Sequence, residues 1–537
     1  MSERTEPTLA GDNSETGDGD STVERATSRV ESLYGSDASA SIQRRSLVAG
    51  EVPVAVYGLG KMGLPIAAVF AEVTENVVGA DIDPDVVASV NAGDSHVDGE
   101  PGLDALVADR VEAGALRAVS DPREAAAAAS VHVIIVPTLL TESDAADLAA
   151  VDAAVDAIAT ELSAGDTVFV ESTVPPRTCA DRIAPRLAEL SGLVPDAFGV
   201  AFCPERTSSG TALRDIREAY PKVVGGVDDE STRVAQLVYE EVTDNEVVPV
   251  RDAATAEATK VFGGVYRDVN IALANEFARY AEAMEIDVRE AIEASNSQPH
   301  SHILSPGPGV GGHCIPVYPY FLTNGFDVDS PLARIARVVN DEMPSHAVDK
   351  LRSILRAEGD GGESDGRKVP GSGVLDGART LVLGVTYHPG VDEIRNSPAI
   401  EIIEELRRYG AAVDAVDPIV SDFGPFAATR LSAAEAVKND YDAVVVVTPH
   451  EEFSAFDWNA LDATTVLDCH DAIDLSGTAH RRYAIGRAQS LGPVGTDDRA
   501  RQSTAEVTAS ADGGTTDVDG GKTDADDRRD DTGGSDA

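Results

Sequence analysis

Three glycines near the start of the chain have the spacing of a dinucleotide-binding turn. Gly58, Gly60 and Gly63 follow the apolar run VPVAVYG and precede the apolar segment LPIAAVFAEV. In a strand–turn–helix unit these glycines make a tight turn, admit a pyrophosphate to the backbone and let the helix pack on the strand. Asp81 lies in the next apolar run, where a carboxylate binds the adenosine ribose 2′-OH and repels a 2′-phosphate. We therefore predict that NAD, and not NADP, binds here.

The four cysteines, Cys179, Cys203, Cys314 and Cys469, lie far apart and form no Cys-x-x-Cys pair. This spacing argues against a zinc site and a disulfide framework and is typical of a reducing compartment. We predict no bound metal, and we expect three of the cysteines to be inert and buried. Cys314 differs because it follows the glycine-rich stretch PGPGVGG, where small residues leave room for a substrate. A thiolate at such a position can act as a nucleophile.

The elements that must position these side chains alternate along the chain. Apolar runs typical of buried strands occupy residues 52–58, 131–138 and 167–173, and Ala-rich helical segments separate them. This alternation predicts a parallel sheet covered by helices on both faces. Thr138 and Thr173 end two of these runs, and ligands bind at the carboxyl ends of strands in such sheets. We expect both threonines beside the nicotinamide half of the cofactor.

The middle of the chain, about 251–350, lacks strand patterns. Its stretch 256–284 carries apolar residues at helical spacing, and a helix of that length crosses between domains or packs against a partner subunit. Strand patterns return after the Gly-rich stretch 359–377. The predicted fold class is α/β, with two Rossmann-like doubly wound domains joined by a central helical region.

Charge and composition exclude several classes of partner. The 537 residues include 93 acidic and 43 basic side chains, a formal charge of −50, so a nucleic acid is excluded as a partner. No apolar run approaches the length that would span a membrane. There are only 7 Lys against 36 Arg, and a body this acidic repels itself unless salt screens it. The composition favours a cytoplasmic protein of a halophile over an acidic surface that binds a basic partner.

Five ordered segments carry a resemblance to a known family. They are ESTVPPRT (171–178), FCPERTSSG (202–210), EATKVFGGVYRDVNIALANE (257–276), PGPGVGGHCIPVYPYF (306–321) and GVTYHPGVDEIRNSPA (384–399). Together they resemble the UDP-glucose/GDP-mannose 6-dehydrogenase family, and the CPER and GPGVGGHCIP sequences are most similar to its N-acetylhexosamine branch. The resemblance covers roughly residues 52–487.

The resemblance implies a four-electron oxidation of the C6 alcohol of a UDP-sugar to a carboxylate, with two NAD and one water consumed. UDP-N-acetylmannosamine is the favoured substrate. Cys314 would form a thiohemiacetal and then a thioester, Lys260 would hold the oxyanion, and Glu205 would activate water. Arg267 follows Lys260 by seven residues, so both lie on one helix face. The long helix would also pair subunits, which implies a homodimer or a higher homo-oligomer.

The expected site residues fall into three sets. The catalytic set is Cys314, Lys260, Glu205 and Thr173. The cofactor-binding set is Gly58, Gly60, Met62, Gly63, Asp81, Thr138, Thr173 and Arg395. The substrate-binding set is Arg206, Thr207, Lys260, Arg267, His300, Gly311, Tyr387 and His388.

The expected domain boundaries follow the composition and the resemblance. We expect a disordered acidic tail (1–48), an NAD-binding Rossmann domain (49–250), a central helical domain with the Cys loop (251–356), a linker (357–377), a UDP-sugar-binding α/β domain (378–490) and a second disordered acidic tail (491–537).

Several positions depart from the family pattern. Tyr318 replaces an Asp usual four residues after the cysteine, and Gly264 replaces an Asn usual four residues after the lysine. The first change removes a carboxylate that could orient water and the second an oxyanion donor, which costs roughly 2.7–4 kcal/mol in transition-state stabilisation. His388, Arg177 and His300 also replace a usual lysine, glycine and arginine. Two alternatives therefore stay open: a UDP-glucose or GDP-mannose dehydrogenase, and a non-catalytic protein that binds nucleotide sugars.

Overall fold

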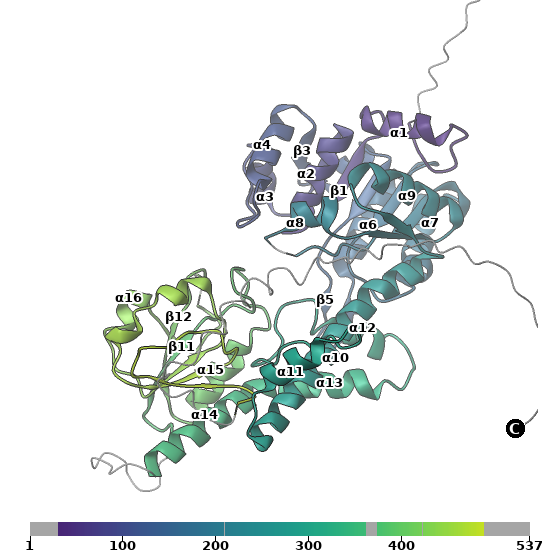
Figure 1. Cartoon of the computed structure of the whole chain (residues 1–537). Coiled ribbons are helices and arrows are strands. Elements are labelled where there is room, and N and C mark those ends of the chain that lie inside the picture. The colour runs from purple at the N-terminus through teal and green to yellow at the C-terminus, as the bar shows by residue number, and fades with distance from the viewer. Residues whose placement is uncertain (1–30, 209, 361–372, 421–422, 488–537) are drawn as a thin grey trace, which may run out of the picture.

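The computed structural model describes residues 31–208, 210–360, 373–420 and 423–487. Within them lie an N-terminal α/β domain, a set of central helices and a C-terminal α/β domain (Figure 1). This is the predicted fold class, and the architecture confirms it.

The N-terminal domain is built on an eight-stranded sheet in the order β10-β9-β8-β7-β4-β1-β2-β3. The pairs are parallel apart from β8–β9, which is antiparallel. The first strand pairs with β2 on one side and β4 on the other, so the strand order reverses beside it. Nucleotides bind at such reversals. The strands are β1 (Val54–Tyr57), β2 (Val77–Ala80), β3 (Leu116–Val119), β4 (Val131–Ile134), β7 (Thr167–Val170), β8 (Gly199–Phe202), β9 (Lys222–Gly226) and β10 (Val247–Pro249).

Helices cover both faces of this sheet because its central strands are buried on both sides. Each of the strands β1, β4 and β7 has four residues, and all of them are buried. Burial on both faces explains why these strands appear in the sequence as continuous apolar runs. The helices are α2 (Gly63–Thr74), α3 (Pro84–Asn91), α4 (Leu103–Glu112), α5 (Pro122–Ala127), α6 (Ala149–Glu161), α7 (Ala184–Ser191), α8 (Ala212–Arg214) and α9 (Asp229–Val242). A two-stranded hairpin, β5 (Leu139–Leu140) and β6 (Ala146–Asp147), follows β4.

The prediction that residues 1–48 form a disordered tail is wrong for the last part of that segment. Residues 40–48 form helix α1 (Ala40–Val48), and Leu33 and Leu47 are buried in the N-terminal core. Arg44 forms ion pairs with Glu240 and Glu241 of α9. The ordered domain therefore begins well before residue 49. Residues 1–30 of the tail and the whole tail 491–537 lie outside the described residues.

The central region consists of helices, and the longest joins the two α/β domains (Figure 1). Helix α10 (Ala253–Met284) has 32 residues and begins where the Asp252 side chain accepts a hydrogen bond from the amide of Thr255. It packs along α13 (Pro331–Asp341) and α12 (Tyr318–Thr323). The other central helices are α11 (Val288–Asn296) and α14 (Met343–Asp360). Helix α14 extends into the segment expected as a linker, of which residues 361–372 lie outside the described residues.

The C-terminal domain holds a six-stranded, all-parallel sheet in the order β13-β12-β11-β14-β15-β16. Its order reverses beside β11, from which the segment 384–399 emerges. The elements are β11 (Arg379–Leu383), α15 (Pro398–Arg408), β12 (Ala412–Val416), β13 (Thr429–Arg430), α16 (Ala433–Ala436), β14 (Ala443–Val446), β15 (Thr465–Asp468) and β16 (Arg481–Ala484). No helix in the described part of the chain has the length and hydropathy for crossing a membrane.

Candidate active site

The glycine-rich loop that carries Cys314 packs against the C-terminal domain. A Cβ on Gly311 would lie 2.6 Å from the Cβ of Tyr387, so only glycine fits at this contact. The amide of Gly312 donates to the carbonyl of Arg395 at 2.9 Å, and the Asn396 side chain donates to the carbonyl of Gly312 at 2.8 Å. The loop and the segment 384–399, separate in the sequence, therefore form one surface.

Cys314 lies in surroundings that favour its thiolate. Burial raises the pKa of the thiol, but the hydrogen bond and charge of His313, the charge of Lys260 and the hydrogen bond of Tyr318 outweigh burial. The net effect lowers the pKa of Cys314 below its ordinary value. The hydrogen bond to Cys314 in turn raises the pKa of His313. This is the arrangement of an activated thiol nucleophile.

The other three cysteines are buried, as predicted for inert thiols. Burial raises the pKa of Cys179, Cys203 and Cys469, so they stay protonated. Only Cys314, which is partly exposed, combines access with a lowered pKa among the cysteines.

Lys260 and Glu205 meet beside this thiol. The Nζ of Lys260, on α10, lies 3.7 Å from Oε2 of Glu205 and donates to the Glu205 backbone carbonyl. Burial raises the pKa of Glu205, but the charge of Lys260 and hydrogen bonds from Thr207 outweigh it, and the net pKa is lowered. Glu205 is therefore an ionised carboxylate that can accept a proton, next to a cation that can hold an oxyanion.

Thr138 and Thr173, expected at the ends of strands, lie four and three residues beyond β4 and β7, and they also meet at this point. Strands β4 and β7 are parallel neighbours, and the Oγ1 of Thr138 donates to the carbonyl of Thr173 at 2.6 Å. The Oγ1 of Thr173 lies 3.1 Å from the hydroxyl of Tyr318. Thr173 thus links the edge of the N-terminal sheet to the group around Cys314.

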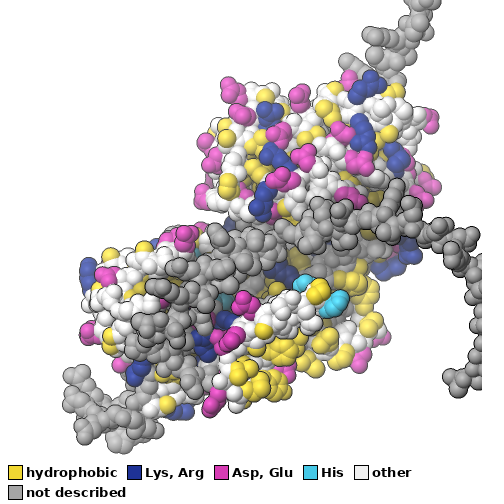
Figure 2. All heavy atoms as spheres, in the orientation of Figure 1, with side chains coloured by type: hydrophobic (Ala, Val, Ile, Leu, Met, Phe, Trp, Pro, Cys, Tyr) yellow, Lys and Arg dark blue, Asp and Glu magenta, His cyan; other side chains and the backbone are white. Residues whose placement is uncertain are grey.

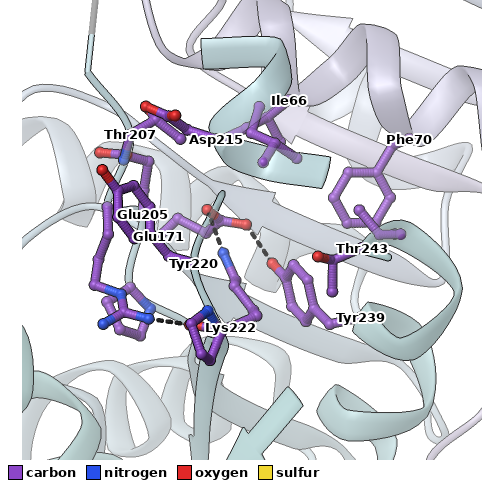
Figure 3. A pocket seen from close by; sticks show the side chains of 15 residues that line it. Ile66, Phe70, Glu171, Glu205, Thr207, Asp215, Tyr220, Lys222, Tyr239 and Thr243 are labelled. Atoms are coloured by element: carbon purple, nitrogen blue, oxygen red, sulfur yellow. Dashed lines mark hydrogen bonds and ion pairs between the residues drawn. The ribbon is translucent and has the colours of Figure 1, made fainter. Parts of the chain in front are cut away.

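Arg206 and Thr207 line a pocket to which Glu205 also contributes, and Figure 3 labels Glu205 and Thr207 in it. Arg206 donates to the carbonyl of Pro221, and the Oγ1 of Thr207 lies 3.1 Å from Sδ of Met62. At the back of the pocket, Glu171 accepts hydrogen bonds from Tyr239 and from Lys222, the latter at 2.9 Å (Figure 3). This buried group supports the strands that carry the CPER segment.

The remaining predicted substrate residues divide into two sets. Arg267 is exposed, and its charge acts on Tyr387, which lies against the glycine-rich loop. His388 is exposed next to Tyr387, with Nδ1 2.8 Å from the carbonyl of Pro389. His300 is exposed in the segment after α11, and within the described residues it makes no hydrogen bond to the Cys314 group. The structure thus brings together the residues around Cys314, whereas the place of His300 in the site stays a prediction.

The glycine turn after β1 has the shape that an NAD pyrophosphate requires. A Cβ on Gly63 would lie 1.9 Å from the Gly58 carbonyl oxygen, so the turn closes only with glycine there. A Cβ on Gly60 would meet nothing within 4 Å, so the turn leaves open space in front of the backbone at the start of α2. Asp81 accepts hydrogen bonds from the amides of Leu59 (2.8 Å) and Asp83, which fix the carboxylate beside the turn. These residues fit NAD.

Three residues near the site carried no predicted role. His313 precedes Cys314, Tyr318 lies one helical turn after it, and Lys61 of the glycine turn donates to the carbonyl of Asp392 at 2.7 Å. The last contact joins the cofactor turn to the C-terminal segment 384–399. Adjacency to Cys314 is the sequence signal that could have pointed to His313, whereas the Lys61 contact spans the two domains and leaves no local signal.

Comparison with known proteins agrees with these features. Three domains of the UDP-glucose/GDP-mannose dehydrogenase family match this chain: the NAD binding domain over residues 52–243, the central domain over 254–342 and the UDP binding domain over 381–475.

Individual proteins are similar over most of their lengths. The chain is 35% identical to the UDP-N-acetyl-D-mannosamine dehydrogenase of Pyrococcus horikoshii, over 76% of this chain and 92% of that protein. It is 34% identical to the NDP-N-acetyl-D-galactosaminuronic acid dehydrogenase of Ralstonia nicotianae, over 77% and 95%. The solved structure of UDP-D-ManNAc dehydrogenase from Pyrococcus horikoshii superposes with a TM-score of 0.73 at 33% identity, covering 81% of this chain and 100% of that chain.

The matches cover both sides of the Cys314 site, the cofactor turn and the segment 384–399. They confirm the predicted enzyme class and the NAD cofactor. This chain, with its NAD-binding turn, its central helices and its UDP-binding domain, belongs to the UDP-glucose/GDP-mannose dehydrogenase family.

Proposed function

We propose that this protein oxidises the C6 alcohol of a UDP-N-acetylhexosamine, with UDP-N-acetylmannosamine the favoured substrate, to the uronate. The observation that carries the proposal is the Cys314 thiol of lowered pKa, held beside Lys260 and Glu205. Relatives named for N-acetylated sugars support the choice of substrate. A reducing, salt-rich cytoplasm is the proposed location, supported by the acidic composition and the free cysteines.

The residues of the site divide the chemistry between them. NAD⁺, when bound, would accept a hydride from C6 in each of two oxidations, and in the first of them Lys260 takes the proton of the C6 hydroxyl. Sγ of Cys314 adds to the aldehyde carbon, and a C–S bond and an oxyanion form, which Lys260 stabilises. After the second oxidation this carbon is a thioester. Glu205 takes a proton from water as the water attacks, the C–S bond breaks, and the Cys314 thiolate leaves. In total, one alcohol, two NAD⁺ and one water give one carboxylate, two NADH and three protons.

The stoichiometry of NADH tests this proposal. We expect two NADH per UDP-N-acetylmannosamine at completion, with limiting sugar and excess NAD⁺ in molar KCl. UDP-N-acetylglucosamine and UDP-glucose are measured in parallel. A ratio near one would contradict the role of Cys314 in the second oxidation, and preference for UDP-glucose would contradict the substrate. Tight UDP-sugar binding without NADH would indicate the non-catalytic alternative.

Activity should depend on salt. With 93 acidic and 43 basic side chains, the folded protein repels itself, and this repulsion is screened within about 3 Å at 1 M salt but about 30 Å at 0.01 M. We expect NADH production and the thermal midpoint of unfolding to fall steeply when KCl is dialysed from molar concentration to 10 mM. Full activity at 10 mM would contradict adaptation to high salt.

We propose that a second copy of this chain covers the exposed face of α10 and α13. Apolar side chains gather over the central helices in Figure 2. On α10 they recur at 4- and 7-residue spacing along one face, and on α13 every third residue, and their exposed fractions range from 43% to 67%. A patch of this kind marks an interaction site. Its residues are Phe262, Tyr266, Leu273, Tyr280, Met284, Leu332, Ile335 and Val338.

Charges placed in this face should separate the subunits. We expect the protein to elute as a dimer or larger in light-scattering chromatography, and Leu332→Glu/Ile335→Glu to elute as a monomer, because two carboxylates cannot be buried unpaired in an interface. Val194→Glu is the matched control, since Val194 is equally exposed (67%) but lies outside the central helices. A wild-type monomer would overturn the proposal.

A further inference from the structure

The side chain of Tyr318 lies between the nucleophile and the edge of the N-terminal sheet. Tyr318 begins α12, and its amide donates to the carbonyl of Cys314 at 3.0 Å. Its side chain is only 6% exposed, and Cys314 packs against the small cluster to which it belongs, close enough for each side chain to shift the pKa of the other. On the other side, its hydroxyl lies 3.1 Å from Oγ1 of Thr173. One phenol group therefore contacts both the thiol and the strand end.

The ring of Tyr318 occupies space that a glycine leaves open. A Cβ on Gly264 would lie 2.1 Å from Cδ2 of Tyr318 and 3.0 Å from its Cγ, whereas carbon atoms in contact lie about 3.5–4.0 Å apart. Gly263, the preceding residue of α10, differs because a Cβ there would meet nothing within 4 Å. The helix therefore requires glycine at position 264 for the tyrosine, and not for its own backbone.

We propose that Tyr318 is a catalytic hydrogen-bond donor, which holds the Cys314 thiolate for attack on the aldehyde while Gly264 provides the socket for its ring. In this arrangement the phenol proton points to Sγ, and the Thr173 hydroxyl donates to the phenol oxygen. The inference rests on the proposed role of Cys314 and adds a residue to it. It also gives the two departures from the family pattern a joint explanation, since the tyrosine needs the glycine.

The electrostatics agree with a donor and not with a base. Burial and the neighbouring Cys314 raise the pKa of Tyr318 well above its ordinary value, so the phenol keeps its proton. A hydrogen bond donated to the charged form of a thiol favours that form. The alternative role is structural: the ring packs with Val261, Val317 and Phe321 in a small apolar cluster. Removal of the hydroxyl alone separates the two roles.

The rate of Cys314 alkylation against pH tests the donor. The full-length protein is treated with iodoacetamide in molar KCl, and label at Cys314 is quantified by mass spectrometry. In the wild type we expect a midpoint below the ordinary thiol pKa of about 8.5. In Tyr318→Phe, which keeps the ring, we expect the midpoint to rise by about one pH unit, the size of a hydrogen bond to a charged group. An unchanged midpoint would overturn the proposal.

This measurement needs no sugar oxidation, so its outcome is independent of the proposed function. If no UDP-sugar yields NADH but the midpoint moves, the substrate assignment fails and the hydrogen bond stands. If NADH forms in a ratio of two and the midpoint does not move, Tyr318 is structural and the proposed function stands.

A pair of neighbouring glycines tests the socket. Gly264→Ala should displace the tyrosine and raise the alkylation midpoint as Tyr318→Phe does, because the new methyl meets the ring. Gly263→Ala is the matched control, with the same chemical change one residue earlier on α10, and should leave the midpoint unchanged. Equal midpoints in the two variants would contradict the socket. Circular dichroism establishes that both variants are folded, and the Tyr318→Phe result stands without them.

Discussion

Replacement of Cys314 by serine should lower the rate of uronate formation by about 10³-fold or more, the loss expected when an enzyme's nucleophile is removed. A serine hydroxyl in the same position stays protonated, because the groups that lower the thiol pKa are too weak to ionise an alcohol. The first oxidation does not use Sγ, so NADH per sugar should approach one instead of two. The amount of uronate is measured by chromatography, and the amount of NADH is measured by absorbance.

The control for this variant is Cys469→Ala. Cys469 is buried in the C-terminal core and its pKa is raised. Its replacement therefore removes one thiol from the protein but leaves the proposed nucleophile, Cys314, in place. Its rate should stay close to that of the wild type. Wild-type uronate formation by Cys314→Ser would show that the thioester route is wrong.

The features that could be predicted from the sequence are those with local causes. The cofactor turn requires glycine at fixed positions because a Cβ on Gly63 would clash with the Gly58 carbonyl. This requirement shows in the sequence as three glycines within six residues. The long central helix could be predicted because its apolar spacing runs through consecutive turns. The same local signals placed Thr138 and Thr173 a few residues beyond the ends of two neighbouring strands, since β4 ends at Ile134 and β7 at Val170.

The features that could not be predicted depend on contacts between distant segments. Residues 31–48 are rich in small and polar side chains, and they are ordered by burial of Leu33 and Leu47 and by the ion pairs of Arg44 with α9, nearly 200 residues away. The contact of Lys61 with Asp392 likewise joins two domains. No pattern within a short window of sequence records such pairs.

The two departures at positions 264 and 318 illustrate this limit. Considered one at a time, each is the loss of a polar group from the site. In the structure they are a single change, because the ring of Tyr318 fills the space beside Gly264 and brings a hydroxyl to Cys314. A spacing of 54 residues hides their contact in the sequence, and the three-dimensional contact supplies the physical reason for both.

Replacement of Lys260 by methionine should have the second large effect, a fall of about 10²–10³-fold in kcat, the loss expected for one oxyanion-stabilising donor. Methionine keeps the length and packing of the side chain but removes its charge. Two pKa values should also change. That of Cys314 should rise, because the charge of Lys260 helps to lower it against burial. That of Glu205 should rise too, since burial raises it and Lys260 provides the largest opposing effect.

These shifts predict the direction of the pH dependence. The reaction needs the Cys314 thiolate, so the rate rises with pH through the thiol pKa, and the curve of Lys260→Met should lie at higher pH than that of the wild type. The profile of kcat/KM from pH 5 to 10 in molar KCl measures it. Lys438→Met is the control, since Lys438 is exposed on the C-terminal domain and its removal changes the net charge equally. A Lys260→Met profile that coincides with the control would contradict this role.

Lys260→Arg separates charge from proton transfer. An arginine restores the positive charge beside Cys314 and Glu205, so the pH profile should return toward that of the wild type. Its guanidinium does not deprotonate in a protein, so it cannot pass a proton during oxidation of the alcohol. We therefore expect recovery of the profile without recovery of kcat. Recovery of both would mean that Lys260 acts by charge alone, and Glu205, the ionised carboxylate 3.7 Å from it, would then be the group that moves protons in every step.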